Sequence, residues 1–125
     1  MILPEADGLL APIMDIDGFR LACLIDASTG MVLAAQQDQA DIGLPAAAAG
    51  ATDIANVLAL LNGRMATGES LEDVIVTFSS SLYMVRPIRR DPDPQILLLV
   101  ILDRLRTNLA MARRSIRDFC VSFAS

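Results

Sequence analysis

The chain has 125 residues and a formal net charge of −5, and its ten basic side chains are all arginine because lysine is absent. This length suits a single domain with one hydrophobic core. The acidic balance argues against general binding of nucleic acid. The absence of histidine removes the commonest general base and the commonest metal ligand.

Hydrophobic residues make up 54% of the chain, but its purest apolar run, residues 96–102, is only seven residues long. A membrane-spanning helix needs roughly 18 or more consecutive apolar residues. The N-terminal segment also lacks the basic residues of a signal peptide. Cys23 and Cys120 are too few for a disulfide framework and are expected to be reduced and packed. We therefore expect a cytoplasmic protein without stable membrane insertion.

Residues 1–17 are expected to be short helix or irregular chain. The first strands predicted after them form a hairpin. Residues 18–25 are apolar on both parities, as in a central strand, and 31–35 return as a second strand. Between them lies "DASTG", whose small polar residues are typical of a turn. Gly30 is expected to supply a positive φ there.

Residues 45–62 predict a helix, with Gly63 placed where a left-handed cap would end it. Its interior polar residues, Thr52, Asp53 and Asn56, form only a narrow stripe. An ordinary surface helix has a wider polar face. This helix is therefore expected to contact more than its own sheet.

Three further strands are predicted as a meander, over 73–78, 82–88 and 96–102. Pro87 cannot donate to a sheet ladder, so it is expected near a strand end or at an unpaired position. An amphipathic helix over 103–119 closes the domain. The apolar face predicted for it consists of Leu105, Leu109, Ala112, Ile116 and Phe119.

We therefore expect an α+β fold with a five-stranded antiparallel sheet in the order β-β-α-β-β-β-α and helices on both faces. One domain is expected over 18–119, followed by a C-terminal tail over 120–125.

No catalytic constellation emerges from the sequence. Asp26 lies near "STG", but aspartic proteases need Asp-Ser/Thr-Gly directly and a second aspartate to share the proton. The serines at 79–81 have no histidine or lysine to activate them. The pair Asp15 and Asp17 resembles a site for a hard cation, but solvated loop acids are far commoner. We expect no enzyme activity, cofactor or metal.

Two groups of arginine are candidates for partner contact. Arg86, Arg89 and Arg90 follow one another at a strand end and loop, where they suit phosphate binding or an arginine finger, against the simpler interpretation of a solvated loop. Arg106, Arg113 and Arg117 form a stripe on the last helix, which is either its wet face or a docking surface.

Self-association is expected from the patterning, because a short meander leaves sheet edges that must be covered or paired. The strand over 73–78 and the helix over 45–62 are the elements whose apolar faces a second copy would bury. The residues predicted at this dimer interface are Ala47, Gly50, Ala51, Ile54, Leu58, Val74, Val76 and Phe78.

The element order and three local patterns resemble the Roadblock (dynein light chain roadblock-type) family. "GFRLACLIDASTGMVLA" is similar to its first hairpin, and "AAAAGATDIANVLALL" to its alanine-rich central helix. "LEDVIVTFSSSLYMVRPI" followed by "ILLLVILDR" is similar to its three-strand meander. The resemblance covers residues 18–119. The family's first helix usually spans several turns, whereas Pro4, Gly8 and Pro12 interrupt the corresponding segment here.

The resemblance implies a sheet between helices, related to profilin-like and longin folds, and a dimer that pairs the third strand and central helix. It also implies a partnership with a small Ras-like GTPase, and in actinobacteria with a sensor kinase or another operon-encoded signalling protein. Three functions follow as hypotheses: a non-enzymatic homodimeric scaffold for such a GTPase, a GTPase-activating protein, and a small-molecule sensor domain.

Overall fold

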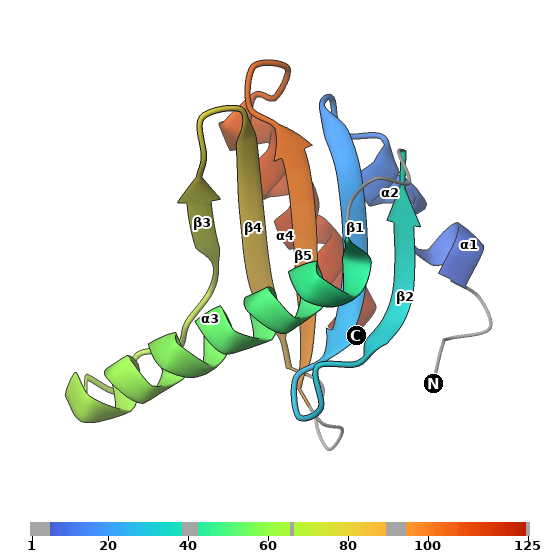
Figure 1. The fold of residues 1–125 in the computed structure, drawn as a ribbon. Helices are drawn as coiled ribbons and strands as arrows, with labels where there is room; N and C mark the ends of the chain where they lie inside the picture. The colour runs from blue at the N-terminus through green and yellow to red at the C-terminus, as the bar shows by residue number, and fades with distance from the viewer. Residues whose placement is uncertain (1–5, 39–42, 66, 90–94, 125) are drawn as a thin grey trace.

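Five antiparallel strands form one sheet in the computed structural model, which describes residues 6–38, 43–65, 67–89 and 95–124. The strand order is β2-β1-β5-β4-β3, so the first hairpin and the later meander meet where β1 pairs with β5 (Figure 1). The strands are β1 (Phe19–Asp26), β2 (Val32–Gln37), β3 (Val74–Thr77), β4 (Ser81–Ile88) and β5 (Ile96–Asp103).

Helices cover both faces of this sheet, as predicted. One face carries α3 (Leu44–Met65), and the other carries α4 (Leu109–Ala124) with the short α2 (Ala11–Met14) (Figure 1). A further single turn, α1 (Ala6–Leu9), precedes α2. The α+β class and the predicted element order are confirmed.

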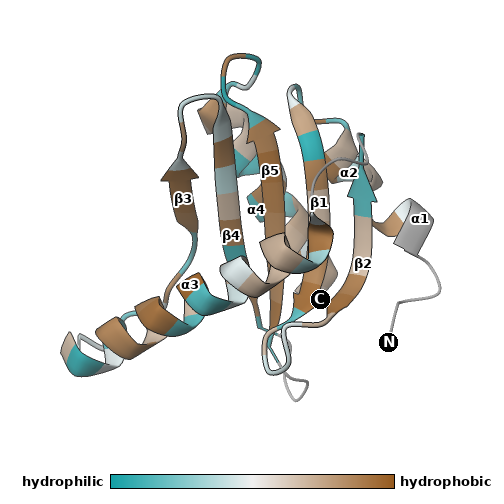
Figure 2. Cartoon of the chain, in the orientation of Figure 1, coloured by the Kyte–Doolittle hydropathy of each residue, from teal (hydrophilic) through white to brown (hydrophobic). Residues whose placement is uncertain are grey.

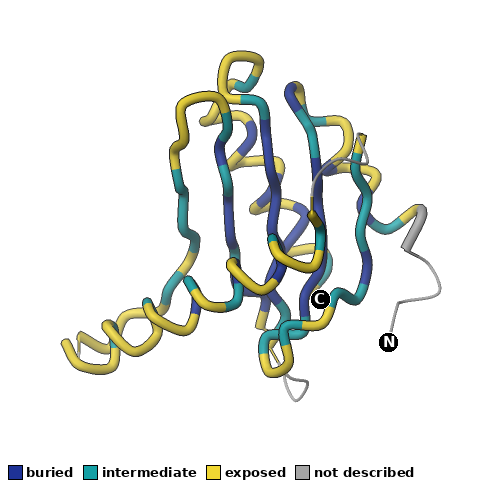
Figure 3. Tube along the Cα trace, in the orientation of Figure 1, coloured by how far each residue is buried: buried dark blue, intermediate teal, exposed yellow. Residues whose placement is uncertain are grey.

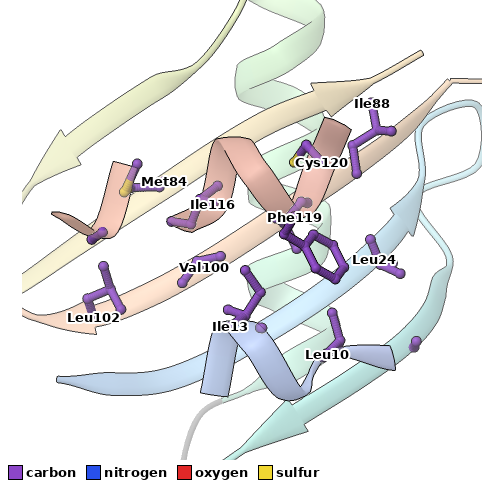
Figure 4. Packing of buried hydrophobic residues seen from close by; sticks show 14 of the residues in the cluster. Leu10, Ile13, Leu24, Met84, Ile88, Val100, Leu102, Ile116, Phe119 and Cys120 are labelled. Carbon is purple, nitrogen blue, oxygen red and sulfur yellow. The ribbon is translucent and has the colours of Figure 1, made fainter. Parts of the chain in front are cut away.

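The period of two along each strand divides the core into two layers. The buried even-numbered residues of β1, β4 and β5, such as Leu24 and Val100, face α2 and α4, while the buried odd-numbered ones, such as Leu21 and Leu99, face α3. Figure 4 shows side chains of α4 packed over the sheet. The central β5 has six consecutive buried residues, which explains its uninterrupted apolar run.

Pro87 has no N–H to donate, and it lies at a position of β4 that does not pair with β3. The pairing of β3 with β4 runs from Thr77–Leu82 to Val74–Val85, so Pro87 is beyond it. It is opposite Leu97 of β5 on the other side. This placement agrees with the expectation of a strand-end position.

Both predicted helices have different bounds from those expected. Leu105 is 89% exposed in a turn before α4, so its place on the predicted apolar face was wrong. The helix begins after Asn108, whose side-chain oxygen accepts the backbone N–H of Met111 at 3.1 Å, as an N-cap does. It continues to Ala124, through most of the expected tail. Gly63 does not end α3, which continues to Met65.

Candidate functional site

The "DASTG" segment is the corner between β1 and β2. One oxygen of the Asp26 carboxylate accepts both the backbone N–H of Ser28, at 2.9 Å, and its hydroxyl, at 2.7 Å. Gly30 has a φ of +78° and donates its N–H to the Asp26 carbonyl at 2.8 Å. The positive φ expected at Gly30 is confirmed.

The Asp26 carboxylate is stabilised in its charged form, because the hydrogen bonds from Ser28 lower its pKa. A protease aspartate instead shares a proton with a second carboxyl group, which raises one of the two pKa values. The geometry at Asp26 is that of a turn.

The two thiols are poor nucleophiles in the folded chain. Burial raises the pKa of Cys23 to about 12. Burial also raises the pKa of Cys120 to about 11, although the nearby Arg86 lowers it. Both cysteines are free and buried, as expected.

No metal site emerges from the described residues. Among them, no three His, Cys, Asp or Glu side chains gather as a metal site requires.

The strongest candidate surface is an apolar hollow between α3 and the β3 edge of the sheet. Its volume is about 190 Å³, below the roughly 300–1,000 Å³ of small-molecule sites. Six of the eight residues predicted for the dimer interface line it: Ala47, Gly50, Ala51, Ile54, Val76 and Phe78. Ala46, Tyr83, Val85 and Leu99 complete the lining.

An aromatic pair, Phe78 and Tyr83, contributes to the lining of this hollow. Phe78 follows β3 directly and is 51% exposed. Its ring meets Tyr83 of β4 edge to face, with 4.9 Å between centroids. An exposed phenylalanine next to an unpaired strand edge is a typical feature of a surface that a partner covers.

The other two predicted interface residues lie beside the hollow. Val74 begins β3, is half-buried and packs against the core layer under α3. Leu58 is half-buried further along α3, in a second hollow between that helix and residues 67–73.

The C-terminal half of α3 projects past the sheet. Only Ala48, Ala51 and Ala55 are buried, and no residue after Ala55 is. The second half extends beyond β3 and is mostly exposed (Figures 1 and 3). Figure 2 shows that this half is largely hydrophobic. Its exposed large side chains are Val57, Leu60, Leu61 and Met65.

By length and composition alone, α3 also meets the criterion for a membrane-crossing helix. It packs on the sheet through Ala48, Ala51 and Ala55, and most of the rest of the helix is exposed. That the chain does not insert stably into a membrane stays a prediction.

The predicted partner-contact arginines do not act as one group. The Arg86 side chain is only 16% exposed and forms an ion pair with Asp73, with 3.6 Å between nitrogen and oxygen. The same Asp73 oxygen lies 3.2 Å from Arg113 of α4. Arg89 is exposed at the end of the strand region, and Arg90 lies outside the described residues. The predicted stripe on the last helix loses Arg106, which lies in the turn before α4.

Sequence reasoning missed Asp73, which joins the segment before β3 to both β4 and α4. Its partners, Arg86 and Arg113, are far from it along the chain, so no local spacing indicates the contact. The only signal was an acidic residue beside an edge strand.

No family model and no curated protein matches the chain. Solved structures do match it across nearly all of its length. The gliding protein MglB of Thermus thermophilus is 17% identical, with a TM-score of 0.81, over 99% of this chain and 93% of that one. A Roadblock/LC7 domain from Streptomyces avermitilis is 19% identical, with a TM-score of 0.79, over 98% and 94%.

A third structure, of an MglB in a tetrameric arrangement, is 17% identical with a TM-score of 0.82, over 99% of this chain and 92% of that one. Identities this low establish the fold rather than the activity. TM-scores of about 0.8 over nearly the whole chain assign that fold. The chain therefore has the fold of the Roadblock/LC7 domains, as its sequence patterns predicted.

Proposed function

We propose that this chain is a homodimeric, non-enzymatic regulator or scaffold that binds a small Ras-like GTPase in the cytoplasm. The observation that carries the proposal is the apolar hollow at the β3 edge, continuous with the exposed apolar half of α3. Two copies that pair their β3 strands about a twofold axis bury both features at once.

The two edges of the sheet differ in the way that this proposal needs. The edge strand β2 ends with Gln36 and Gln37, whereas β3 consists of Val74, Ile75, Val76 and Thr77. An apolar edge strand is favourable only when it is paired or covered. Pairing is therefore proposed at β3 rather than at β2.

The length of α3 supports the same arrangement. A helix of 22 residues is about 33 Å long, whereas four strand spacings span only about 19 Å. The excess carries Leu60 and Leu61 past β3, over the position that a paired second sheet would occupy. The apolar end of each helix then covers the partner's strands.

A GTPase partner is proposed for two reasons. The chain has the Roadblock fold, and two kinds of side chain considered above for catalysis are engaged in structure or buried. Asp26 is engaged in a turn, and both thiols are buried. One fold neighbour is described as a gliding protein and another as an assembly of four. A fold used in such assemblies suits a role in bringing proteins together rather than in side-chain chemistry.

The homodimer is tested by size-exclusion chromatography with light scattering. At micromolar concentration we expect twice the chain mass of 13.4 kDa. A monomer at this concentration contradicts the dimer.

The partner is tested with purified Ras-like GTPases encoded in the same genome, each loaded with GDP or with a non-hydrolysable GTP analogue. The immobilised chain is expected to retain one of them in a nucleotide-dependent way. Retention of none, in either state, contradicts the GTPase proposal.

Phosphate release then distinguishes a scaffold from a GTPase-activating protein. Because the guanidinium of Arg86 is held by Asp73, we expect the rate of GTP hydrolysis to stay unchanged when the chain is added. Acceleration that is lost in Arg89→Ala would instead support the activating function.

A further inference from the structure

A groove of mixed charge lies on the sheet face opposite α3. It runs between the segment that precedes β3 and the outer side of α4, with a volume of about 310 Å³. We name it the arginine groove, after four of its seven lining residues: Glu72, Asp73, Arg86, Ala110, Arg113, Arg114 and Arg117.

The floor of the arginine groove holds one carboxylate between two arginines. One oxygen of Asp73 contacts both Arg86, at 3.6 Å, and Arg113, at 3.2 Å. Asp73 and Arg86 are about equally buried, with side chains 15% and 16% exposed. This pairing fixes the position of the groove wall relative to α4.

The rim of the groove keeps positive charge. Arg114 and Arg117 are exposed on α4, and neither forms an ion pair with another described residue. With four arginines and two acids, the groove carries a formal charge of +2 in a chain whose net charge is −5. Positive charge is therefore concentrated here against the overall balance.

This concentration has a cost within α4 itself. Arg113 and Arg117 are four residues apart, and Arg114 and Arg117 are three apart, so each pair lies on one side of the helix. Like charges at these spacings destabilise a helix by about 0.2–0.5 kcal/mol per pair. Asp73 compensates Arg113. Arg114 and Arg117 form no ion pair with another described residue, and an uncompensated pair of like charges is expected where a surface has a function.

The surroundings of the groove favour a protein partner. Val121, which is 64% exposed, lies one helical turn beyond Arg117 on the same helix. Arginine beside exposed apolar side chains is typical of protein interfaces. Glu72 also lines the groove and is exposed, so the groove disfavours the uniform negative charge of a lipid surface or a nucleic acid and favours a segment whose carboxylates are spaced among neutral side chains.

We propose that the arginine groove docks an acidic segment of a partner protein, with carboxylates of that segment paired to Arg114 and Arg117. The groove belongs to a single chain. If the proposed β3-paired dimer forms, the extended sheet carries two such grooves on one face. One groove belongs to each copy, and the two paired β3 strands lie between them. Two acidic segments, or one partner with two, then bind the face opposite α3.

The test uses the full-length ¹⁵N-labelled chain and a synthetic peptide of alternating glutamate and leucine as probe. We expect chemical-shift changes centred on the amides of α4 and of residues 72–73. The variant Arg114→Ala/Arg117→Ala is expected to bind about tenfold more weakly, since two charge pairs are lost. Raising the salt concentration weakens binding further because the rim pairs are exposed.

The matched control is Arg64→Ala/Arg106→Ala, which removes the same charge from exposed positions outside the groove. Equal weakening by the control reduces the effect to net charge and overturns the proposal. So does binding that leaves the α4 amides unchanged.

Two further probes separate the other anionic partners. Vesicles of phosphatidylserine and phosphatidylcholine, or a 20-base-pair DNA duplex (a length of about two helical turns), overturn the proposal if they bind these amides more tightly than the peptide. If the chain binds the peptide but retains no GTPase, the proposal for the groove stands and only the proposed GTPase partnership is contradicted.

Discussion

Gly18 joins the N-terminal segment to β1 at a position that glycine alone fits. Its φ is +88°, and a Cβ placed there would lie 3.1 Å from the Asp103 carbonyl oxygen and closer still to the Thr107 hydroxyl. That hydroxyl donates to the carbonyls of Asp17 or Asp103, at 3.0 and 2.7 Å. The backbone of three segments therefore meets at this residue.

We predict that Gly18→Ala destabilises the chain by about 2 kcal/mol, from the left-handed conformation and the displaced Thr107 side chain. Gly63→Ala is the control, since that glycine lies within α3 with no heavy atom near its added methyl group. It is expected to stabilise by about 0.5–1 kcal/mol. Urea unfolding followed by circular dichroism measures both, and an equal effect at the two positions contradicts the special role of Gly18.

At the scale of elements, Asp73 connects parts of the chain that share no sequence neighbourhood. It immediately precedes β3, while its partners Arg86 and Arg113 belong to β4 and α4. Removing the carboxylate leaves Arg86 in a site that is mostly shielded from water. A cation left without its partner in such a site costs more than an exposed one.

We predict that Asp73→Asn lowers the free energy of unfolding by about 1–3 kcal/mol. Glu72→Gln is the matched control, because Glu72 is exposed and forms no ion pair with another described residue. Its effect is expected within about 0.5 kcal/mol. Hydrogen exchange should also quicken in β3 for Asp73→Asn. Unchanged stability in that variant would contradict a structural role for the ion pair.

The elements that the sequence predicted best are those whose pattern has one physical cause. The apolar run in β5 indicates burial on both faces, and the strand is indeed covered by helices on both sides. Leu105 was wrongly assigned to the last helix because its spacing from Leu109 continues the apolar face toward the N-terminus. The capping side chain of Asn108 marks its true start. The contacts of Asp73 had no pattern to predict them, because they arise only when the sheet is formed.

At the scale of the whole molecule, a continuous stretch of exposed apolar surface lies at one edge of the sheet. The hollow at β3, the Phe78 ring and the projecting half of α3 adjoin one another, while the arginine groove occupies the opposite face. The sequence indicated this edge through the narrow polar stripe of α3. It gave no measure of how far the helix projects, since that depends on the width of the sheet beneath it.

Ile54 offers the sharpest test of self-association at this edge. Its side chain is half-buried in the hollow, and twofold symmetry brings the same position of a second copy toward it. Ile54→Glu therefore places two like charges in a surface that the dimer would remove from water. We predict a dissociation constant at least about tenfold higher, with a monomer at micromolar concentration by light scattering.

Asn56→Glu is the control, because it adds the same charge at an exposed position of α3 outside the hollow. It is expected to remain dimeric. The far-ultraviolet circular dichroism of both variants should match that of the unmodified chain, since neither side chain is fully buried. An Ile54→Glu variant that stays dimeric with this spectrum would move the interface away from the β3 edge, and the two arginine grooves of a dimer would then no longer share one face.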